Sequence, residues 1–194
     1  LKKFGIGDPT SIDLQEETAL SLRSAEKWGD VDLATISFGQ GIAITGMQMV
    51  RAVAAIANDG VLMQPHLVKA IIGDTTIEVP AKSLRQVISR EAAQDMTAMM
   101  VNAFQAGEAQ WTKMPGYKIA GKTGTAQVPV AGHYDKDKTI ASFVGFAPAD
   151  DPKFVMLVKF REPTSSPWAA DTAAPLWTRI AKHLFLYYGI SPQE

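Results

Sequence analysis

The sequence predicts an α+β fold in which helices flank an antiparallel sheet. Three strand candidates follow one another directly, at about 117–127, 139–147 and 153–161. The second and third are joined by the short segment APADDP, whose turn-forming residues are typical of a hairpin between antiparallel strands. Helical patterns come before these strands, and another covers about 171–188 at the end of the chain. Helices segregated from a run of adjacent strands are typical of the α+β class.

The first forty residues give weaker signals. Glycine and proline within residues 5–9 indicate a turn. A short helix is expected within residues 15–27, and residues 32–38 predict a brief extended segment. The glycines at 39–41 are interpreted as a turn and not as a dinucleotide-binding loop, because no long buried strand precedes them and the third glycine of that motif is missing.

The helix predicted next has signals at both ends. Thr45 is a favourable N-cap and Gln48 follows three residues later, which is the arrangement of a capping box. Gly60 suits the left-handed conformation that ends many helices. Within the run MQMVRAVAAIA the only charged residue is Arg51. The helix is therefore expected to be buried nearly all round.

Further along, the short apolar run at 67–72 predicts a strand. Ser89 is the expected cap of a second helix, with Glu91 in the first turn, where an acidic side chain suits the helix dipole. This helix is expected to end near Gly107.

Composition narrows the class of protein. The chain has 194 residues, of which 46% are hydrophobic and 20% charged, and its net charge is −1. These values are typical of a globular domain and show no footprint of a nucleic-acid-binding protein. The absence of cysteine excludes disulfides, thiolate metal sites and cysteine nucleophiles. The chain begins with LKKFGIG and not with Met, so we expect it to be a piece of a longer protein.

The segment GYKIAGKTGTAQ, at 116–127, allows two interpretations. It matches the phosphate-binding pattern G-x-x-x-x-G-K-[ST], and it also contains the triplet K-T-G. A phosphate loop needs a helix directly after it, since the free N–H groups of that helix hold the phosphate. Here Gly124, β-branched residues and Pro129 follow, so the sequence argues against a phosphate loop.

A K-T-G on an edge strand has a different chemical use. The backbone N–H groups of the strand would be open to an incoming acyl group, and Gly124 would let a substrate lie close to the backbone. Lys122 would supply a positive charge, and the hydroxyls of Thr123 and Thr125 would add hydrogen bonds to the same anion. A surface strand with an ordinary lysine is the alternative if the triplet is taken alone.

The surrounding segments favour the K-T-G interpretation. GKTGTAQ, SFGQGIAITGMQMVRAVAAIANDGVLMQPHLV, IASFVGFAPADDPKFVMLV and AAPLW resemble the class B penicillin-binding proteins, in the order that this family has them, from about Phe4 to Trp177. The resemblance implies the penicillin-binding transpeptidase fold, which serine β-lactamases share. Residues 1–194 would then be the C-terminal portion of a transpeptidase domain.

This resemblance also implies a function. The family members are peptidoglycan D,D-transpeptidases of cell-wall synthesis and cell division, anchored in the bacterial cytoplasmic membrane with the catalytic domain on its outer side. They cross-link D-Ala-D-Ala peptide stems through a serine acyl-enzyme, need no cofactor or metal, are trapped by β-lactams, and work with other membrane proteins of cell-wall synthesis. By this resemblance Lys122, Thr123, Gly124 and Thr125 bind substrate, and the backbone N–H of Thr125 is one oxyanion-hole donor.

Two of the three family motifs are not found. No serine is followed two residues later by asparagine, so S-x-N is absent. One S-x-x-K exists, at Ser24 and Lys27, but ten serines and thirteen lysines in 194 positions give about 0.7 such pairs by chance. Its charged surroundings, RSAEKWGD, do not suit a buried, lysine-activated nucleophile. We therefore expect the nucleophilic serine upstream of this chain, and the chain alone to be inactive.

Two alternatives stay open. A serine β-lactamase shares K-T-G, although the long match from Gly39 to His66 favours the transpeptidase. A non-catalytic module, either a penicillin-recognising sensor or a cell-wall scaffold, would share the fold and lack the catalytic residues. The histidines do not have metal-ligand spacing, and His133 is expected in a polar loop at 131–138.

Overall fold

The computed structural model describes residues 1–15, 17–18, 20–130 and 133–193. The chain forms two compact units, Leu1–Gln94 and Asp95–Glu194, and the division falls within helix α3 (Arg90–Ala106). No described helix has the length and apolar character needed to cross a membrane.

The described part of the first unit combines two short helices, two 3₁₀ turns and two strand pairs, and its helix α2 has a capping box at its start. This unit contains the 3₁₀ turns η1 (Lys2–Phe4) and η2 (Ala25–Lys27), helices α1 (Asp30–Ser37) and α2 (Gly46–Ala57), and two antiparallel strand pairs, β1 (Val61–Gln64) with β4 (Lys82–Gln86) and β2 (Ala70–Ile72) with β3 (Thr76–Glu78). The capping box of α2 is confirmed: the Gln48 N–H donates to Thr45 Oγ1 at 3.1 Å, and the Thr45 N–H donates to Gln48 Oε1 at 3.0 Å. The end of the helix is confirmed too, with Gly60 at φ +84°.

The only charged residue of helix α2, Arg51, is buried. Apart from the exposed Gly46, the residues of α2 are buried or half-buried, as predicted. Arg51 is itself buried, and its guanidinium donates to the carbonyl oxygens of Gly5 at 2.7 Å and Pro9 at 3.2 Å. The arginine thus ties the start of the chain to the helix.

Two predictions for the first unit are wrong. Residues 32–38, expected to be extended, lie in α1 or at its end. The reason is local capping: Asp32 accepts the Gly29 N–H at 3.0 Å at the start of the helix, and this contact offsets the β-branched residues that follow. In the range 15–27, where a helix was expected, the described residues contain only the turn η2, and residues 16 and 19 lie outside the described part.

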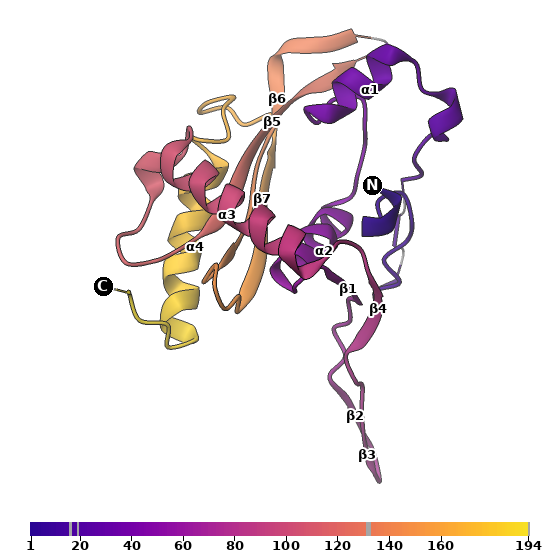
Figure 1. Cartoon of the computed structure of the whole chain (residues 1–194), viewed down its shortest axis with the longest axis vertical. Helices are drawn as coiled ribbons and strands as arrows, with labels where there is room; N and C mark the ends of the chain where they lie inside the picture. Colours follow the sequence, from indigo (N-terminus) through magenta and orange to yellow (C-terminus); the bar gives the residue numbers. More distant parts are fainter. Residues whose placement is uncertain (16, 19, 131–132, 194) are drawn as a thin grey trace. The chain divides into compact units, whose positions relative to one another are not determined.

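The second unit is a three-stranded sheet covered by helices. It contains most of α3, the 3₁₀ turn η3 (Gln110–Thr112), the strands β5 (Ala120–Val130), β6 (His133–Ala147) and β7 (Phe154–Arg161), and helix α4 (Ala173–Tyr187). The sheet is antiparallel in the order β5-β6-β7, and Figure 1 shows α4 lying along it. The predicted α+β class and the three adjacent strands are confirmed. The Ser89 cap of α3 is also confirmed, because Ser89 Oγ accepts the Ala92 N–H at 3.1 Å.

The hairpin between β5 and β6 is tighter than the sequence suggested. Residues 133–138, predicted to be part of a polar loop, belong to β6, and Val130 pairs with His133. Residues 131–132 of that predicted loop lie outside the described part. Pro129 pairs with Tyr134, beyond an irregularity in the register between Gln127 and Pro129.

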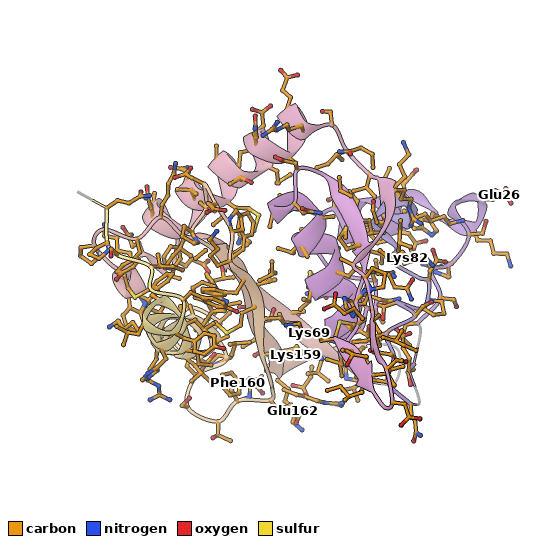
Figure 2. The ribbon with its side chains drawn as sticks, turned by 90° about the horizontal axis from the view of Figure 1, so that it is seen from below. Glu26, Lys69, Lys82, Lys159, Phe160 and Glu162 are labelled. Carbon is orange, nitrogen blue, oxygen red and sulfur yellow. The ribbon has the colours of Figure 1, made fainter. Side chains whose placement is uncertain are left out.

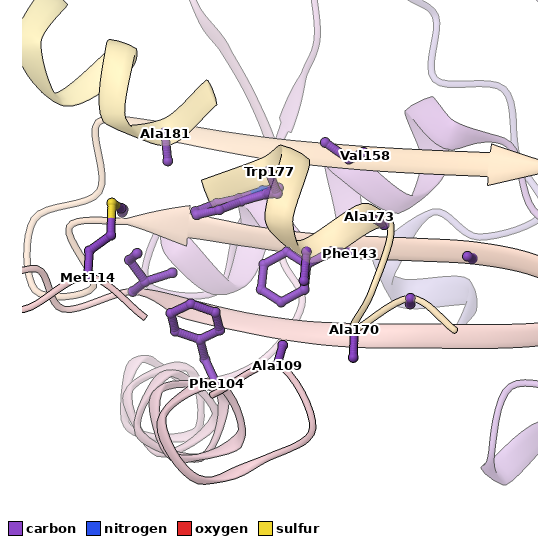
Figure 3. Close-up of a cluster of buried hydrophobic side chains, with 14 of the residues drawn as sticks. Phe104, Ala109, Met114, Phe143, Val158, Ala170, Ala173, Trp177 and Ala181 are labelled. Carbon is purple, nitrogen blue, oxygen red and sulfur yellow. The ribbon is translucent and has the colours of Figure 1, made fainter. Parts of the chain in front are cut away.

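The core of the second unit is built around Phe143 on β6 (Figure 3). Its ring makes edge contacts with Phe104 of α3 and Trp177 of α4, at centroid distances of 5.5 and 5.2 Å. Alanines such as Ala173 and Ala181 let α4 lie close to the sheet, and the Trp177 Nε1–H donates to the Met156 carbonyl at 2.9 Å. This packing holds β6 against α3 and α4, and β5 is held in turn by its pairing with β6.

Candidate functional site

The K-T-G segment lies on an edge strand. Lys122, Thr123, Gly124 and Thr125 follow one another on β5, which pairs with β6 and, among the described residues, with no other strand. Backbone groups on the free edge of such a strand are open to an added ligand. The sequence prediction that these four residues share an edge strand is therefore confirmed.

The backbone directions along this edge follow from two hydrogen bonds. Ser142, opposite Gly124 on β6, donates its hydroxyl to the Gly124 carbonyl at 3.2 Å, so that carbonyl points toward β6. Carbonyl directions alternate along an antiparallel strand, which turns the Thr123 carbonyl toward the free edge. In the same alternation the N–H of Thr125 points to the free edge beside it.

The position of the Lys122 side chain supports the backbone directions inferred for Thr123 and Thr125. Its Nζ donates to the Thr123 carbonyl at 3.1 Å and is 3.3 Å from Thr123 Oγ1, although successive side chains of a strand leave on opposite faces. The lysine can reach both atoms by curving around the free edge, since β6 occupies the other side. An exposed ammonium group thus lies at the edge where the open backbone groups are.

The side chains of the segment divide between two faces of the sheet. Thr123 pairs with Phe143 and Thr125 with Ala141, so both threonines share the face of the aromatic core. Lys122 and Gly124 lie on the opposite face. The segment therefore carries two hydroxyl groups on one face, and the Lys122 side chain leaves from the opposite face and brings its ammonium group to within 3.3 Å of the Thr123 hydroxyl.

Both glycines of the segment are required by neighbouring side chains. A Cβ at Gly121 would lie 2.4 Å from the Phe143 ring, and a Cβ at Gly124 would lie 2.8 Å from Ser142 Oγ. The sequence suggested that Gly124 lets a substrate approach, and the structure adds a second reason, which is the space taken by Ser142. The contact with Phe143 therefore accounts for Gly121 without a phosphate-binding role.

The hydroxyl of Thr125 joins the site to a loop. Thr125 Oγ1 accepts the backbone N–H of Ala169 at 3.2 Å, which lies in the loop between β7 and α4. Thr139 of β6 holds the same loop by donating to the Pro167 carbonyl at 2.6 Å. Sequence reasoning missed both contacts and also missed Ser142, because only strand register and loop closure bring these residues to the segment.

The loop between β7 and α4 starts at Glu162, which forms an ion pair with Lys138. Lys159, Phe160 and Glu162 lie at the end of β7 (Figure 2), and Glu162 accepts a hydrogen bond from Lys138 Nζ at 2.9 Å. This contact raises the pKa of Lys138 and lowers the pKa of Glu162. Because both side chains are exposed, the pair adds little stability, but it marks where the loop leaves the sheet.

The phosphate-loop alternative does not fit the structure. Residues 121–123 lie near the start of strand β5, which continues through the motif to Val130, so no helix follows the motif directly. The rejected S-x-x-K pair also lies in an unsuitable element. Ser24 precedes the three-residue turn η2, in which the Lys27 N–H donates to the Ser24 carbonyl at 2.9 Å. No cluster of three or more potential metal-ligating side chains exists among the described residues.

Comparisons with known proteins agree with this architecture. The family model of the penicillin binding protein transpeptidase domain matches residues 1–182. The chain is 36% identical to the stage V sporulation protein D of Bacillus subtilis, covering 100% of this chain and 31% of that protein. It is 31% identical to a probable peptidoglycan D,D-transpeptidase, PenA, of Neisseria meningitidis, covering 99% of this chain and 32% of that protein.

Solved structures give the same result. A crystal structure of penicillin binding protein 3 from Mycobacterium tuberculosis, complexed with ampicillin, matches with a TM-score of 0.90 and 32% identity. The match covers 100% of this chain and 46% of that one. The α+β arrangement described above is thus the fold of these transpeptidase domains. The chain spans about a third of the length of the curated relatives and about half of the solved chain.

Proposed function

Since this chain belongs to the transpeptidase family of the class B penicillin-binding proteins, we propose that it is the C-terminal portion of a peptidoglycan D,D-transpeptidase domain. The observation that supports this most directly is the K-T-G segment on the free edge of β5. The chain provides the substrate-binding edge of the site. The nucleophilic serine, with S-x-x-K and S-x-N, lies in a part of the protein outside these 194 residues.

The reaction we propose has two acyl-transfer steps. The serine oxygen attacks the carbonyl carbon of the D-Ala-D-Ala amide, the C–N bond breaks, and the terminal D-Ala leaves with a proton on its amine. An amine of a neighbouring stem then attacks the acyl-enzyme, which releases the serine. β-Lactams imitate the first step, since opening of their amide leaves an acyl group on the same serine.

Each residue of the segment has a role in this proposal. The N–H of Thr125 donates to the oxyanion that forms at the attacked carbonyl, together with a second donor outside the segment. The hydroxyls of Thr123 and Thr125 and the ammonium group of Lys122 bind the terminal carboxylate of the stem. Charge-assisted hydrogen bonds of this kind are about twice as strong as neutral ones.

The setting of the enzyme is part of the proposal. The domain works on the outer side of the bacterial cytoplasmic membrane, held there by an anchor elsewhere in the protein and accompanied by other membrane proteins of cell-wall synthesis. This assignment rests on the family resemblance.

Mass spectrometry of the full-length protein that contains this chain tests the reaction. After exposure to benzylpenicillin, intact-mass and peptide-mapping spectra should show one adduct on a serine outside residues 1–194. An adduct on Ser24 would show that the rejected motif is the real one. A folded full-length protein that forms no adduct would instead indicate the non-catalytic sensor or scaffold.

The role of Lys122 is tested with a matched pair of variants. Lys122→Ala should lower the rate of acylation by roughly tenfold to a hundredfold, the order expected when one hydrogen bond to a charged group, worth about 1.5–3 kcal/mol, is removed. Lys182→Ala, on the exposed surface of α4, removes the same side chain elsewhere and should leave the rate unchanged. Equal rates for both variants would remove Lys122 from the site.

A further inference from the structure

We infer that the loop between β7 and α4 positions the hydroxyl donor of Thr125, through the hydrogen bond from the Ala169 N–H to Thr125 Oγ1. The inference rests on the proposed function, because it concerns how the carboxylate-binding hydroxyl is oriented. Ala169 is a positioning residue in this scheme, and its backbone N–H does the positioning.

The argument starts from the hydrogen-bonding capacity of a hydroxyl. The group has one proton to donate and two lone pairs that accept, and its proton turns freely unless a neighbour fixes it. When the Ala169 N–H occupies one lone pair, the O–H of Thr125 has to point away from the loop. Its remaining directions include the free edge of β5, where the ligand carboxylate is proposed to bind.

The loop is held well enough to act in this way. Thr139 donates to the Pro167 carbonyl at 2.6 Å, and the Glu162 N–H donates to the Thr139 carbonyl at 2.8 Å. Ala169 is fully buried in the aromatic core, and its carbonyl accepts the Ala174 N–H at 2.9 Å at the start of α4. The donor therefore belongs to a segment fixed to the sheet, to the core and to a helix.

Inside the loop, side chains and backbone close a compact turn around Trp168. Ser166 Oγ donates to Asp171 at 2.9 Å and accepts the Trp168 N–H at 3.2 Å, and the Thr172 hydroxyl donates to the Trp168 carbonyl at 2.7 Å. The Trp168 side chain is exposed while the next two residues are buried. The turn thus presents the Ala169 N–H inward, toward β5.

Thr123 provides the comparison within the same strand. It lies on the same face as Thr125, two residues away. Among the described residues its hydroxyl contacts the ammonium group of Lys122, at 3.3 Å, and not the loop. The loop contact is therefore a property of Thr125 and not of every threonine of the segment. A variant at Thr123 can remove a hydroxyl from the segment while the loop contact stays.

Hydrogen exchange in the full-length protein without ligand tests the contact itself. Thr125→Val keeps the shape of the side chain and removes the acceptor, so exchange of the Ala169 amide should become about tenfold faster. Thr125→Ser should restore the wild-type rate, and Thr123→Val should leave it unchanged. Unchanged exchange in Thr125→Val would overturn the inference, whether or not the protein is acylated.

A double-mutant cycle tests whether the loop acts through Thr125. Thr139→Val removes the hydrogen bond from the Thr139 hydroxyl to the Pro167 carbonyl without changing the K-T-G segment, and should lower the rate of acylation by benzylpenicillin about threefold to tenfold. In the Thr125→Val background it should have no further effect, since the hydroxyl that the loop positions is already gone. Additive effects would assign a purely structural role to the loop and overturn the inference.

The two proposals fail in different ways. If wild-type protein forms no acyl-enzyme, the proposed function is wrong, and the exchange rates still decide whether Thr125 joins the loop to the strand. If acylation occurs and Thr125→Ser acylates no faster than Thr125→Val, the proposed function stands and the positioning role is wrong. Melting temperatures of all variants identify any substitution that acts by unfolding the domain.

Discussion

Gly121 and Gly124 occupy positions where the neighbouring strand leaves too little room for a Cβ atom. At Gly121 the obstacle is the buried ring of Phe143, and at Gly124 it is the hydroxyl of Ser142. The two obstacles differ in mobility. The ring is locked between other aromatic side chains, whereas a serine hydroxyl can rotate about one bond. The two glycines should therefore differ in their tolerance of alanine.

Gly121→Ala is expected to destabilise the domain by about 2 kcal/mol, because overpacking a rigid core typically costs one to three. The measurement is the urea midpoint, followed by near-ultraviolet circular dichroism. Gly73→Ala is the control, since a Cβ there meets only the Thr75 carbonyl at 3.9 Å. A Gly121→Ala protein as stable as the control would show that Phe143 can move aside.

Gly124→Ala is expected to cost less stability, about 1 kcal/mol, since the main loss is the hydrogen bond from Ser142. Adding Ser142→Ala removes the hydroxyl that the new Cβ would meet. Since that hydroxyl's hydrogen bond is already lost in Gly124→Ala, the double variant should be about as stable as Ser142→Ala alone. Acylation of the double variant by benzylpenicillin, compared with that of Ser142→Ala, then separates the two reasons for the glycine. Equal stability with slower acylation would mean that the substrate also needs the space above Gly124.

At the scale of elements, side chains at helix ends decide where helices begin. The Thr45–Gln48 capping box and the Ser89 cap start α2 and α3 where the sequence placed them. Asp32 does the same for α1, against the β-branched composition of that segment. Strand pairs depend on hydrogen bonds between residues that are far apart in the sequence. Asp13 is an example, because its carboxylate holds the backbone leading into β2.

Asp13 predicts a pH dependence of the first unit. Its carboxylate accepts the N–H groups of Val68 at 2.8 Å and Leu67 at 2.6 Å, and these bonds lower its pKa. A carboxyl whose pKa is lower in the folded state stabilises the fold above its unfolded pKa, near 3.9, and stops doing so as the pH falls through the folded pKa. Asp13→Asn should therefore be less stable than wild type at neutral pH, with the difference closing below about pH 4.

Exchange rates of the Leu67 and Val68 amides, measured from neutral pH to about pH 3, report this contact directly. Corrected for intrinsic exchange, protection in wild type should fall toward that of Asp13→Asn as the solution becomes acidic. Asp74→Asn, on the exposed turn between β2 and β3, is the control and should behave as wild type at each pH. A difference between wild type and Asp13→Asn that stays constant with pH would contradict the prediction.

At the scale of the whole molecule, the chain consists of two compact units. The K-T-G strand belongs to the second unit, and the only S-x-x-K pair, Ser24 with Lys27, belongs to the first. The chain spans about a third of the length of its curated relatives. We therefore expect its chemistry to depend on sequence beyond these 194 residues.

The 194-residue chain alone is predicted not to be acylated. Without a nucleophile the open edge of β5 cannot form an acyl-enzyme, whatever it binds. The check is the intact mass of the isolated chain after exposure to benzylpenicillin, beside the full-length protein under the same conditions. A stoichiometric adduct on any serine of the chain would overturn both this prediction and the rejection of Ser24.

The sequence by itself determined the features that depend on neighbours along the chain. The caps of α2 and α3, the three adjacent strands, the last helix and the K-T-G segment on a strand followed from patterns spanning a few residues. The same patterns misled at α1, where the hydrogen bond that the Asp32 carboxylate accepts from the Gly29 N–H outweighed strand propensity. Propensity is a weak signal over eight residues, and a single cap can reverse it.

Only the tertiary structure decided which distant residues meet the K-T-G segment. Ser142 lies opposite Gly124 because of the register of β5 against β6, and a shift of one residue would place it on the other face. Ala169 reaches Thr125 across 44 positions of sequence, through the closure of a loop. Burial of Arg51 likewise depends on carbonyl groups more than forty residues away. Such contacts carry no local pattern, since they form only when packing brings separate elements together.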